Sequence, residues 1–174
     1  ANADGSCVYI DRDDSGSGDV IFRNCKFINC GNTSKDGGAI YIQDIDNVSQ
    51  KVIFENCIAV GCEADEGGFL YCNDSDAVIN GSGSTVILDC LAIYGGGGGY
   101  TEAVNTFDGF IFADNKSADD GGGMYNNNGT DGVSTISNCR FYRNVAGDSI
   151  NKYAGGGLYV RDDNGYVKNC KFFE

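Results

Sequence analysis

The stretch Asn24-Cys25-Lys26-Phe27 decides the fold of this chain, because it recurs along the sequence with its residue types nearly unchanged. We recognise five further copies: Asn56-Cys57-Ile58-Ala59, Asp89-Cys90-Leu91-Ala92, Gly109-Phe110-Ile111-Phe112, Asn138-Cys139-Arg140-Phe141 and Asn169-Cys170-Lys171-Phe172. Self-similarity at a period of about 20 to 50 residues is typical of solenoids, propellers and repeat arrays. The fold therefore has to be read from the repeat.

A second motif, a glycine pair followed by a tyrosine, precedes the copies. Its units start at Gly5 (a degenerate copy), Gly37, Gly67, Gly96, Gly121 and Gly155. The spacings are uneven, so the differences in length belong in loops. Each unit reads as a short strand, a polar loop, a second strand and a third strand that starts at the cysteine. Three short strands per turn predict an all-β parallel β-helix of about six rungs, in a single domain over residues 1–174.

Alternation along the third strand indicates which side chains face the core. Asn24 and its equivalents are residue types that tolerate a left-handed backbone, which predicts a corner in every rung. After that corner, Cys25 and Phe27 would point inward and Lys26 outward. A second apolar column precedes the corner: Phe22, Phe54, Ile87, Phe107, Ile136 and Val167. Stacked columns of like residues are what a solenoid core requires.

Composition excludes several functions. The net charge of −13 argues against nucleic acid and anionic membrane surfaces as partners. The chain also lacks an apolar run long enough to span a bilayer, which predicts no membrane insertion.

The cysteines allow two interpretations. Equivalent inward residues on adjacent rungs lie within the Cα separation that a disulfide permits. The candidate pairs are Cys25 with Cys57, Cys30 with Cys62, and Cys139 with Cys170. The alternative is a ladder of buried free thiols. Because the chain has nine cysteines, at least one stays unpaired or links to another chain.

Asn-x-Ser/Thr sequons are more frequent than chance, which predicts about two. They occur at Asn32, Asn47, Asn73, Asn80, Asn115 and Asn128. This excess indicates a glycosylated, extracellular surface. Asn115 is the least favourable candidate, because it shares a column with Cys30, Cys62 and Asn144.

Acidic loops follow most of the tyrosines, and stacked carboxylates there could bind Ca²⁺. The candidate ligands are Asp11, Asp13, Asp44, Asp46, Asp74, Asp76, Asp162 and Asp163. Solvated turns are the competing interpretation, since aspartate and asparagine are ordinary turn residues. No other cofactor is expected.

Catalysis is not expected. Asp119-Asp120 and Asp13-Asp14 are the nominal carboxylate pairs for sugar hydrolysis, but neighbours on a strand face opposite ways. The chain has no histidine and only 12 basic residues. The sequence therefore predicts a protein that is not an enzyme. A tyrosine column (Tyr9, Tyr41, Tyr71, Tyr100, Tyr125 and Tyr159) could bind sugars, or could simply pack between strands.

The repeat resembles a known family. Gly37-Gly38-Ala39-Ile40 matches the GGA[ILV] signature, and Phe112 to Asn115 and Phe141 to Asn144 match the F-x-x-N signature, of the chlamydial polymorphic outer membrane proteins. The resemblance implies a right-handed β-helix in a secreted or surface-displayed adhesin. The chain departs from the F-x-x-N signature in two ways. Cys30 and Cys62 stand in place of the asparagine, and Ala59 and Ala92 stand in place of the phenylalanine.

Together these features predict an extracellular structural or adhesive module that is secreted or displayed at the cell surface. Copies would stack end to end into a filament, through end-rung contacts at Cys7, Tyr9, Cys170 and Phe172. Host or surface glycans are the other expected partners. The alternative function is binding or cleavage of a polysaccharide along one face of the solenoid.

Overall fold

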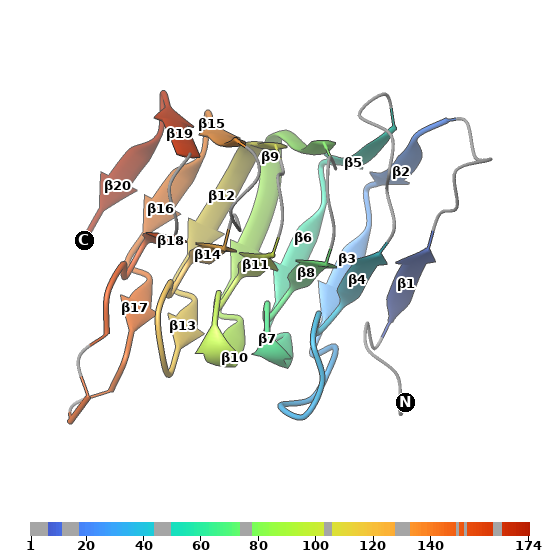
Figure 1. Ribbon diagram of the computed structural model, residues 1–174. Helices are drawn as coiled ribbons and strands as arrows, with labels where there is room; N and C mark the ends of the chain where they lie inside the picture. The colour runs from blue at the N-terminus through green and yellow to red at the C-terminus, as the bar shows by residue number, and fades with distance from the viewer. Residues whose placement is uncertain are drawn as a thin grey trace.

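The computed structural model describes residues 7–11, 18–43, 50–73, 78–102, 106–127, 133–148, 150–151, 153–161 and 165–174. Over this part of the chain the backbone winds into a parallel β-solenoid of about five turns, whose strands stack side by side from β1 to β20 (Figure 1). The predicted all-β parallel β-helix is confirmed. Among the described residues, no helix is long and apolar enough to cross a membrane.

The first sheet contains the strands that follow the glycine pairs. Each repeat copy contributes one strand, and every neighbouring pair in the sheet is parallel. In order along the sheet, its strands are β1 (Val8–Asp11), β4 (Ile40–Gln43), β8 (Leu70–Asn73), β11 (Gly99–Thr101), β14 (Met124–Asn127) and β18 (Leu158–Arg161).

The second sheet bends at the asparagine corner, so most rungs give it two short strands. Before the corner lie β2 (Val20–Arg23), β5 (Lys51–Glu55), β15 (Ser134–Ser137) and β19 (Gly165–Lys168). After it lie β3 (Lys26–Ile28), β6 (Ile58–Val60), β16 (Arg140–Tyr142) and β20 (Lys171–Phe173). In the two middle rungs, β9 (Val78–Leu88) and β12 (Thr106–Ala113) run through the corner as single strands.

The third sheet is short and lies between the second sheet and the next glycine pair. Its strands, in order, are β17 (Val145–Ala146), β13 (Lys116–Ser117), β10 (Leu91–Gly95) and β7 (Glu63–Glu66). The chain enters it through a second left-handed corner at Asn29, Gly61, Asp89, Asp114 and Arg143. Two of the three predicted strands per rung, those before and after the first corner, therefore lie in the second sheet, and the third sheet was not predicted from the sequence.

The core is built from columns of like side chains. Phe27, Ala59, Ile87, Phe112, Phe141 and Phe172 align in register along the axis. The Phe112 and Phe141 rings stack with their centroids 5.0 Å apart, and Phe112 is fully buried. Aromatic stacking adds to the free energy gained by burying each ring.

The two glycines of each pair are required for different structural reasons, as Gly67 and Gly68 show. Gly67 has a φ of +65°, a left-handed conformation that favours glycine. Gly68 lies so close to the next rung that an added Cβ would be 2.7 Å from the Leu91 carbonyl oxygen and closer still to that of Gly97. The pair therefore sets both the turn and the tight approach of neighbouring rungs.

The third repeat copy was aligned wrongly from the sequence. Thr85, not Cys90, follows the first corner in that rung, because Val86 pairs with Ile58 and Thr85 with Phe110. Left-handed residues Ser82 and Gly83 lie just before this corner, within a stretch where the register shifts. Cys90 belongs instead to the second corner, and Ile87 to the Phe27 column.

The second corner carries an inward ladder of Cys30, Cys62, Cys90, Asn115 and Asn144. Asn115 is fully buried there, and its side-chain oxygen accepts a hydrogen bond from the Cys90 N–H at 2.9 Å. Its Nδ2 donates to the Ile87 carbonyl at 3.0 Å and to Asn144 Oδ1 at 2.9 Å. The ladder thus satisfies backbone groups that the corner removes from the sheets.

Candidate functional site

The tyrosine column forms a stacked ladder on the outer side of the first sheet. Tyr41, Tyr71, Tyr100 and Tyr125 are buried, and successive ring centroids along the column are 4.7 to 5.3 Å apart. Because each ring faces the next, the ring edges and hydroxyl groups are what a ligand could reach. The Tyr41 hydroxyl, for example, accepts a hydrogen bond from Asn73 Nδ2 at 2.9 Å.

A column of acidic residues, which stand just before the glycine pairs, runs beside this ladder from rung to rung. Gly95 pairs in register with Glu66 on one side and with Asp120 on the other. Because Gly95 has no side chain, a gap opens between these two carboxylates above Tyr100 and Tyr125. The gap is a cleft of about 400 Å³, the tyrosine cleft, which is lined by Glu66, Tyr94, Tyr100, Asp119, Asp120, Tyr125, Tyr159 and Arg161.

The Glu66 carboxyl is the most perturbed acid in the tyrosine cleft. Burial, together with the negative charges of Asp36, Glu102 and Asp65, raises its pKa to about 7. Burial and the neighbouring Asp120 also raise the pKa of Asp119. The cleft therefore combines hydrogen-bond acceptors, tyrosine hydroxyls and one guanidinium, a set that suits a polyhydroxylated ligand. Glu66 was not predicted from the sequence, although it stands directly before a glycine pair.

We expect Glu66→Gln to stabilise the protein above neutral pH. The folded carboxyl keeps its proton up to about pH 7, whereas the ordinary pKa is 4.5. Ionisation therefore opposes folding, so the free energy of unfolding falls as the pH rises between these two values. Discounted for partial exposure, the gain should be about 1–2 kcal/mol at about pH 8 and near zero at about pH 4. Urea unfolding at both pH values measures it, and an equal gain at both would contradict this account.

The outer face of the second sheet carries a contiguous apolar surface, the outer strip. It consists of two outward columns: Ile28, Val60, Leu88, Ala113, Tyr142 and Phe173, beside Ile58, Val86 and Ile111. Ile28 is 58% exposed and Phe173 47%, while most of the other residues are partly exposed. Contiguous apolar surface of this kind marks interaction sites. The sequence signal was available in the residue that directly follows Phe27 and each of its equivalents, but it was not used.

Positive charges flank the outer strip in an otherwise acidic chain. Lys26, Arg140 and Lys171 continue the Ile58 column at the two ends of the solenoid, and all three are exposed. Glu66, Glu102, Asp119 and Asp120, in contrast, lie near the tyrosine column. The solenoid therefore presents an apolar surface with cations at its two ends and an acidic surface on different sheets.

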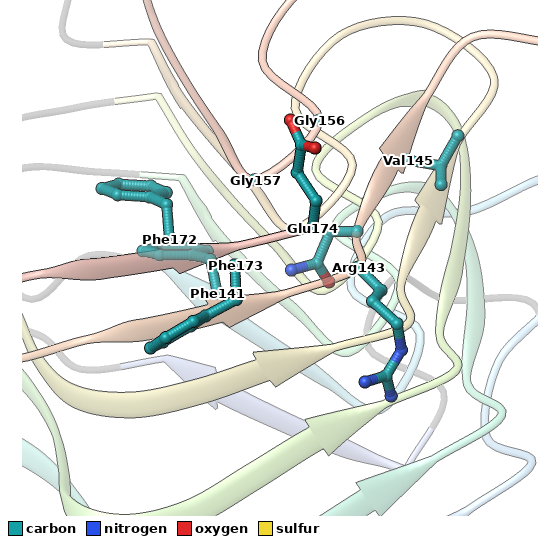
Figure 2. A pocket seen from close by; sticks show the side chains of 9 residues that line it. Phe141, Arg143, Val145, Gly156, Gly157, Phe172, Phe173 and Glu174 are labelled. Carbon is teal, nitrogen blue, oxygen red and sulfur yellow. The ribbon is translucent and has the colours of Figure 1, made fainter.

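A second hollow, the end cleft, lies beside β17, the edge strand of the third sheet. It has a volume of about 610 Å³ and is lined by Phe141, Arg143, Asn144, Val145, Gly156, Gly157, Phe172, Phe173 and Glu174. Figure 2 shows the phenylalanine rings on one side of the end cleft and Arg143 and Glu174 away from them. Of the predicted end-rung contacts, Phe172 is 54% and Tyr9 46% exposed, Cys7 is exposed and Cys170 partly so.

The predicted disulfide partners are neighbours in the structure, where the cysteines are free thiols. Cys25 and Cys57 are in hydrogen-bonding contact, as are Cys139 and Cys170. Cys62 contacts both Cys30 and Cys90, and the contact with Cys90 was missed. The F-x-x-N spacing did not reveal it, because Ile87 and Cys90 fit the pattern of Phe54 and Cys57 as well as that of Phe112 and Asn115.

The sequons fall into three groups. Asn32, Asn73 and Asn80 are partly exposed. Asn47 and Asn128 lie outside the described residues. Asn115 has to be corrected as a glycosylation candidate, because it is 0% exposed and its Nδ2, the atom that would carry the glycan, donates two hydrogen bonds.

The calcium loops mostly lie outside the described residues: this holds for Asp13, Asp44, Asp46, Asp74, Asp76, Asp162 and Asp163. Asp11 is described and exposed. Over the described ranges, no group of three or more His, Cys, Asp or Glu side chains is placed to hold a metal ion. Calcium binding in these loops stays a prediction. Of the nominal catalytic pairs, Asp119 and Asp120 line the tyrosine cleft, and Asp13-Asp14 is not described.

Comparisons with known proteins give no match to a family model, to a curated protein or to a solved structure. The class of this protein, a parallel β-solenoid, therefore rests on its own repeats and strand register.

Proposed function

We propose that this chain is an extracellular structural and adhesive β-solenoid module, and that copies of it associate through the outer strip. The observation that carries the proposal is the contiguous apolar surface along six rungs of the second sheet. With ~4.8 Å between rungs it runs for about 24 Å. Exposing an apolar surface of this extent to water costs free energy, unless a partner covers the surface.

Charge complementarity favours a second copy as that partner. Lys26, Arg140 and Lys171 flank the outer strip, whereas the chain as a whole has a net charge of −13. A symmetric pairing of two strips would bring these cations together. Contact between the strip of one copy and the acidic surface of the next avoids that repulsion. Such a contact is heterologous and open, so it extends into rows of solenoids.

End-to-end stacking is the second contact that we propose for this assembly. Phe172 stacks on Phe141 with its centroid 4.9 Å away, and Tyr9 stacks on Tyr41 at 5.3 Å. Phe172 is 54% exposed and Tyr9 46% exposed, so part of each side chain is accessible to a further copy. The resemblance to the chlamydial polymorphic outer membrane proteins and the exposed sequons support a secreted or surface location for such a module.

Leu88→Lys is expected to weaken the association of copies at least tenfold. A lysine at the centre of the outer strip adds a charge that contact would have to desolvate. Sedimentation velocity over a range of concentrations measures the change. Val133→Lys is the matched control, because Val133 is also exposed but lies outside the strip. A wild-type chain that stays monomeric at the highest concentration, or an equal effect of both variants, would refute association through the strip.

The tyrosine cleft favours one alternative, carbohydrate binding or cleavage. Its carboxylates and tyrosine hydroxyls would accept and donate hydrogen bonds to sugar hydroxyls. A glycan array combined with a reducing-sugar assay separates the two functions. Binding that is lost in Asp120→Ala would favour the carbohydrate function, and release of reducing ends would show hydrolysis.

A further inference from the structure

Two of the four described sequons share a local geometry that the other two lack. The Asn32 side-chain oxygen accepts hydrogen bonds from the N–H of Ser34 at 3.0 Å and from the Ser34 hydroxyl. The Asn80 side-chain oxygen accepts a hydrogen bond from the N–H of Ser82 at 2.6 Å. In both sequons the third residue therefore binds the oxygen of its own asparagine, as in an Asx-turn.

The amide nitrogens of these two asparagines make no hydrogen bond that a glycan would replace, within the part of the chain that the structure describes. A carboxamide nitrogen carries two N–H donors, and an N-linked glycan takes the place of one of them. Asn32 and Asn80 are partly exposed, and Ser34 and Ser82 are exposed. A glycan on either nitrogen would therefore leave the hydrogen bonds of the fold intact.

Both sequons also lie where the chain departs from the regular rung. Asn80 pairs with Asp108 and Thr85 with Phe110, so residues 81–84 stand opposite Gly109 alone. This insertion contains the rest of the Asn80 sequon. In the first rung, residues 32–36 form turns and bends where later rungs have strands of the third sheet. Such irregular segments accommodate bulky groups more readily than stacked strands do.

Asn73 and Asn115 differ in the direction of the amide nitrogen. Asn115 is 0% exposed, and its Nδ2 donates to both the Ile87 carbonyl and Asn144. A chain with a glycan there would lose part of this buried ladder and would not reach the fold. Asn73 Nδ2 donates to the hydroxyl of Tyr41 on the preceding rung at 2.9 Å, so it is directed along the tyrosine column.

We propose that Asn32 and Asn80 carry N-linked glycans in the folded protein, and that Asn73 and Asn115 do not. The donor would be an oligosaccharide on an isoprenoid diphosphate. Nδ2 of the asparagine attacks the anomeric carbon of the sugar and forms a carbon–nitrogen bond. The carbon–oxygen bond to the diphosphate breaks, the diphosphate leaves, and Nδ2 loses one proton.

This assignment rests on the proposed function for its extracellular setting, because N-linked glycans are found on surface loops of secreted proteins. Neither Asn32 nor Asn80 belongs to the outer strip or to the tyrosine cleft. The two glycans are therefore attached outside the residues that define both candidate surfaces.

The test is secretion of the full chain, behind a signal peptide, from a eukaryotic cell that N-glycosylates its proteins. Enzymatic deglycosylation of the secreted protein in heavy-oxygen water converts each modified asparagine into a labelled aspartate, which peptide mapping locates. We expect label at Asn32 and Asn80 and none at Asn73 and Asn115. Label at Asn73 or Asn115, or its absence from Asn32 or Asn80, would overturn the assignment.

Substitutions of the sequon serines show that the label reports this chemistry. Ser34→Ala should abolish the label at Asn32 and leave Asn80 labelled, and Ser82→Ala should do the reverse. Thr33→Ala is the matched control, because Thr33 is exposed beside Ser34 but is not the hydroxyl residue that the sequon requires. Label at Asn32 that survives Ser34→Ala would contradict N-linked modification there.

The same map of the natively isolated protein keeps this inference separate from the proposed function. Glycans at Asn32 and Asn80 in the native protein would support both the assignment and the extracellular location. A native protein without them would overturn the modification. Association of copies would still be decided by sedimentation velocity of the wild type and Leu88→Lys, so either claim can fail while the other stands.

Discussion

Gly68→Ala is expected to be the most destabilising single substitution described here, with a loss of about 4 kcal/mol or more in the free energy of unfolding. The new Cβ would lie 2.7 Å from the carbonyl oxygen of Leu91 and closer to that of Gly97. Both obstacles are backbone atoms held by the rungs on that side, so no rotamer change relieves the clash. Urea unfolding followed by circular dichroism measures the loss.

Gly99→Ala is the matched control, because the same change there, in the first sheet, meets only atoms at ordinary contact distances. The nearest atom to its added Cβ is Cε1 of Phe112 at 3.6 Å, an ordinary contact distance. We expect a change of less than about 1 kcal/mol there. Similar stability of the two variants would contradict the claim that the second glycine of each pair is needed for the close approach of neighbouring rungs.

Asn115→Ala is expected to cost about 3–5 kcal/mol, the second largest effect. It removes the bonds that the Asn115 side chain makes with the Cys90 N–H, the Ile87 carbonyl and Asn144. Buried backbone groups left without partners carry their full desolvation penalty. Thermal unfolding monitored by circular dichroism gives the loss.

Asn32→Ala is the control for Asn115→Ala. Asn32 is only partly exposed, but its side-chain oxygen bonds locally, to the N–H of Ser34 at 3.0 Å. We expect a loss of about 1 kcal/mol or less. A comparable loss in both variants would mean that the ladder at the second corner does not support the fold.

The fold could be predicted from the sequence because successive rungs carry the same residue types at equivalent corner and core positions. Asn24 and Asn56 mark the corner by their tolerance of a left-handed backbone, and both have positive φ. Phe27 and Lys26 then show which side faces the core. Repetition of this signal compensates for the weakness of each short strand.

The third rung was misaligned because two corners carry nearly the same residues. Asp89-Cys90 at the second corner looks like Asn56-Cys57 at the first, and both Asp89 and Asn56 are left-handed. The true equivalent of Cys57 is Thr85, whose hydroxyl donates to the Phe54 carbonyl at 3.0 Å. Residue type could not separate the two corners, because an apolar residue stands three positions before the cysteine at both, Phe54 before Cys57 and Ile87 before Cys90.

The candidate surfaces were harder to predict than the core. The tyrosine cleft depends on Gly95, which looks like one more member of a glycine-rich turn until its register with Glu66 and Asp120 is known. The outer strip depends on which residues from six separate strands come into line. Such surfaces arise from the stacking of rungs, so they are not visible in any one repeat.

The measurement that tests the central claim most directly is electron microscopy of the wild-type chain beside Leu88→Lys at the same high concentration. We predict rows of laterally associated solenoids for the wild type and dispersed particles for Leu88→Lys. Dispersed single particles for both proteins would contradict a structural function based on the outer strip.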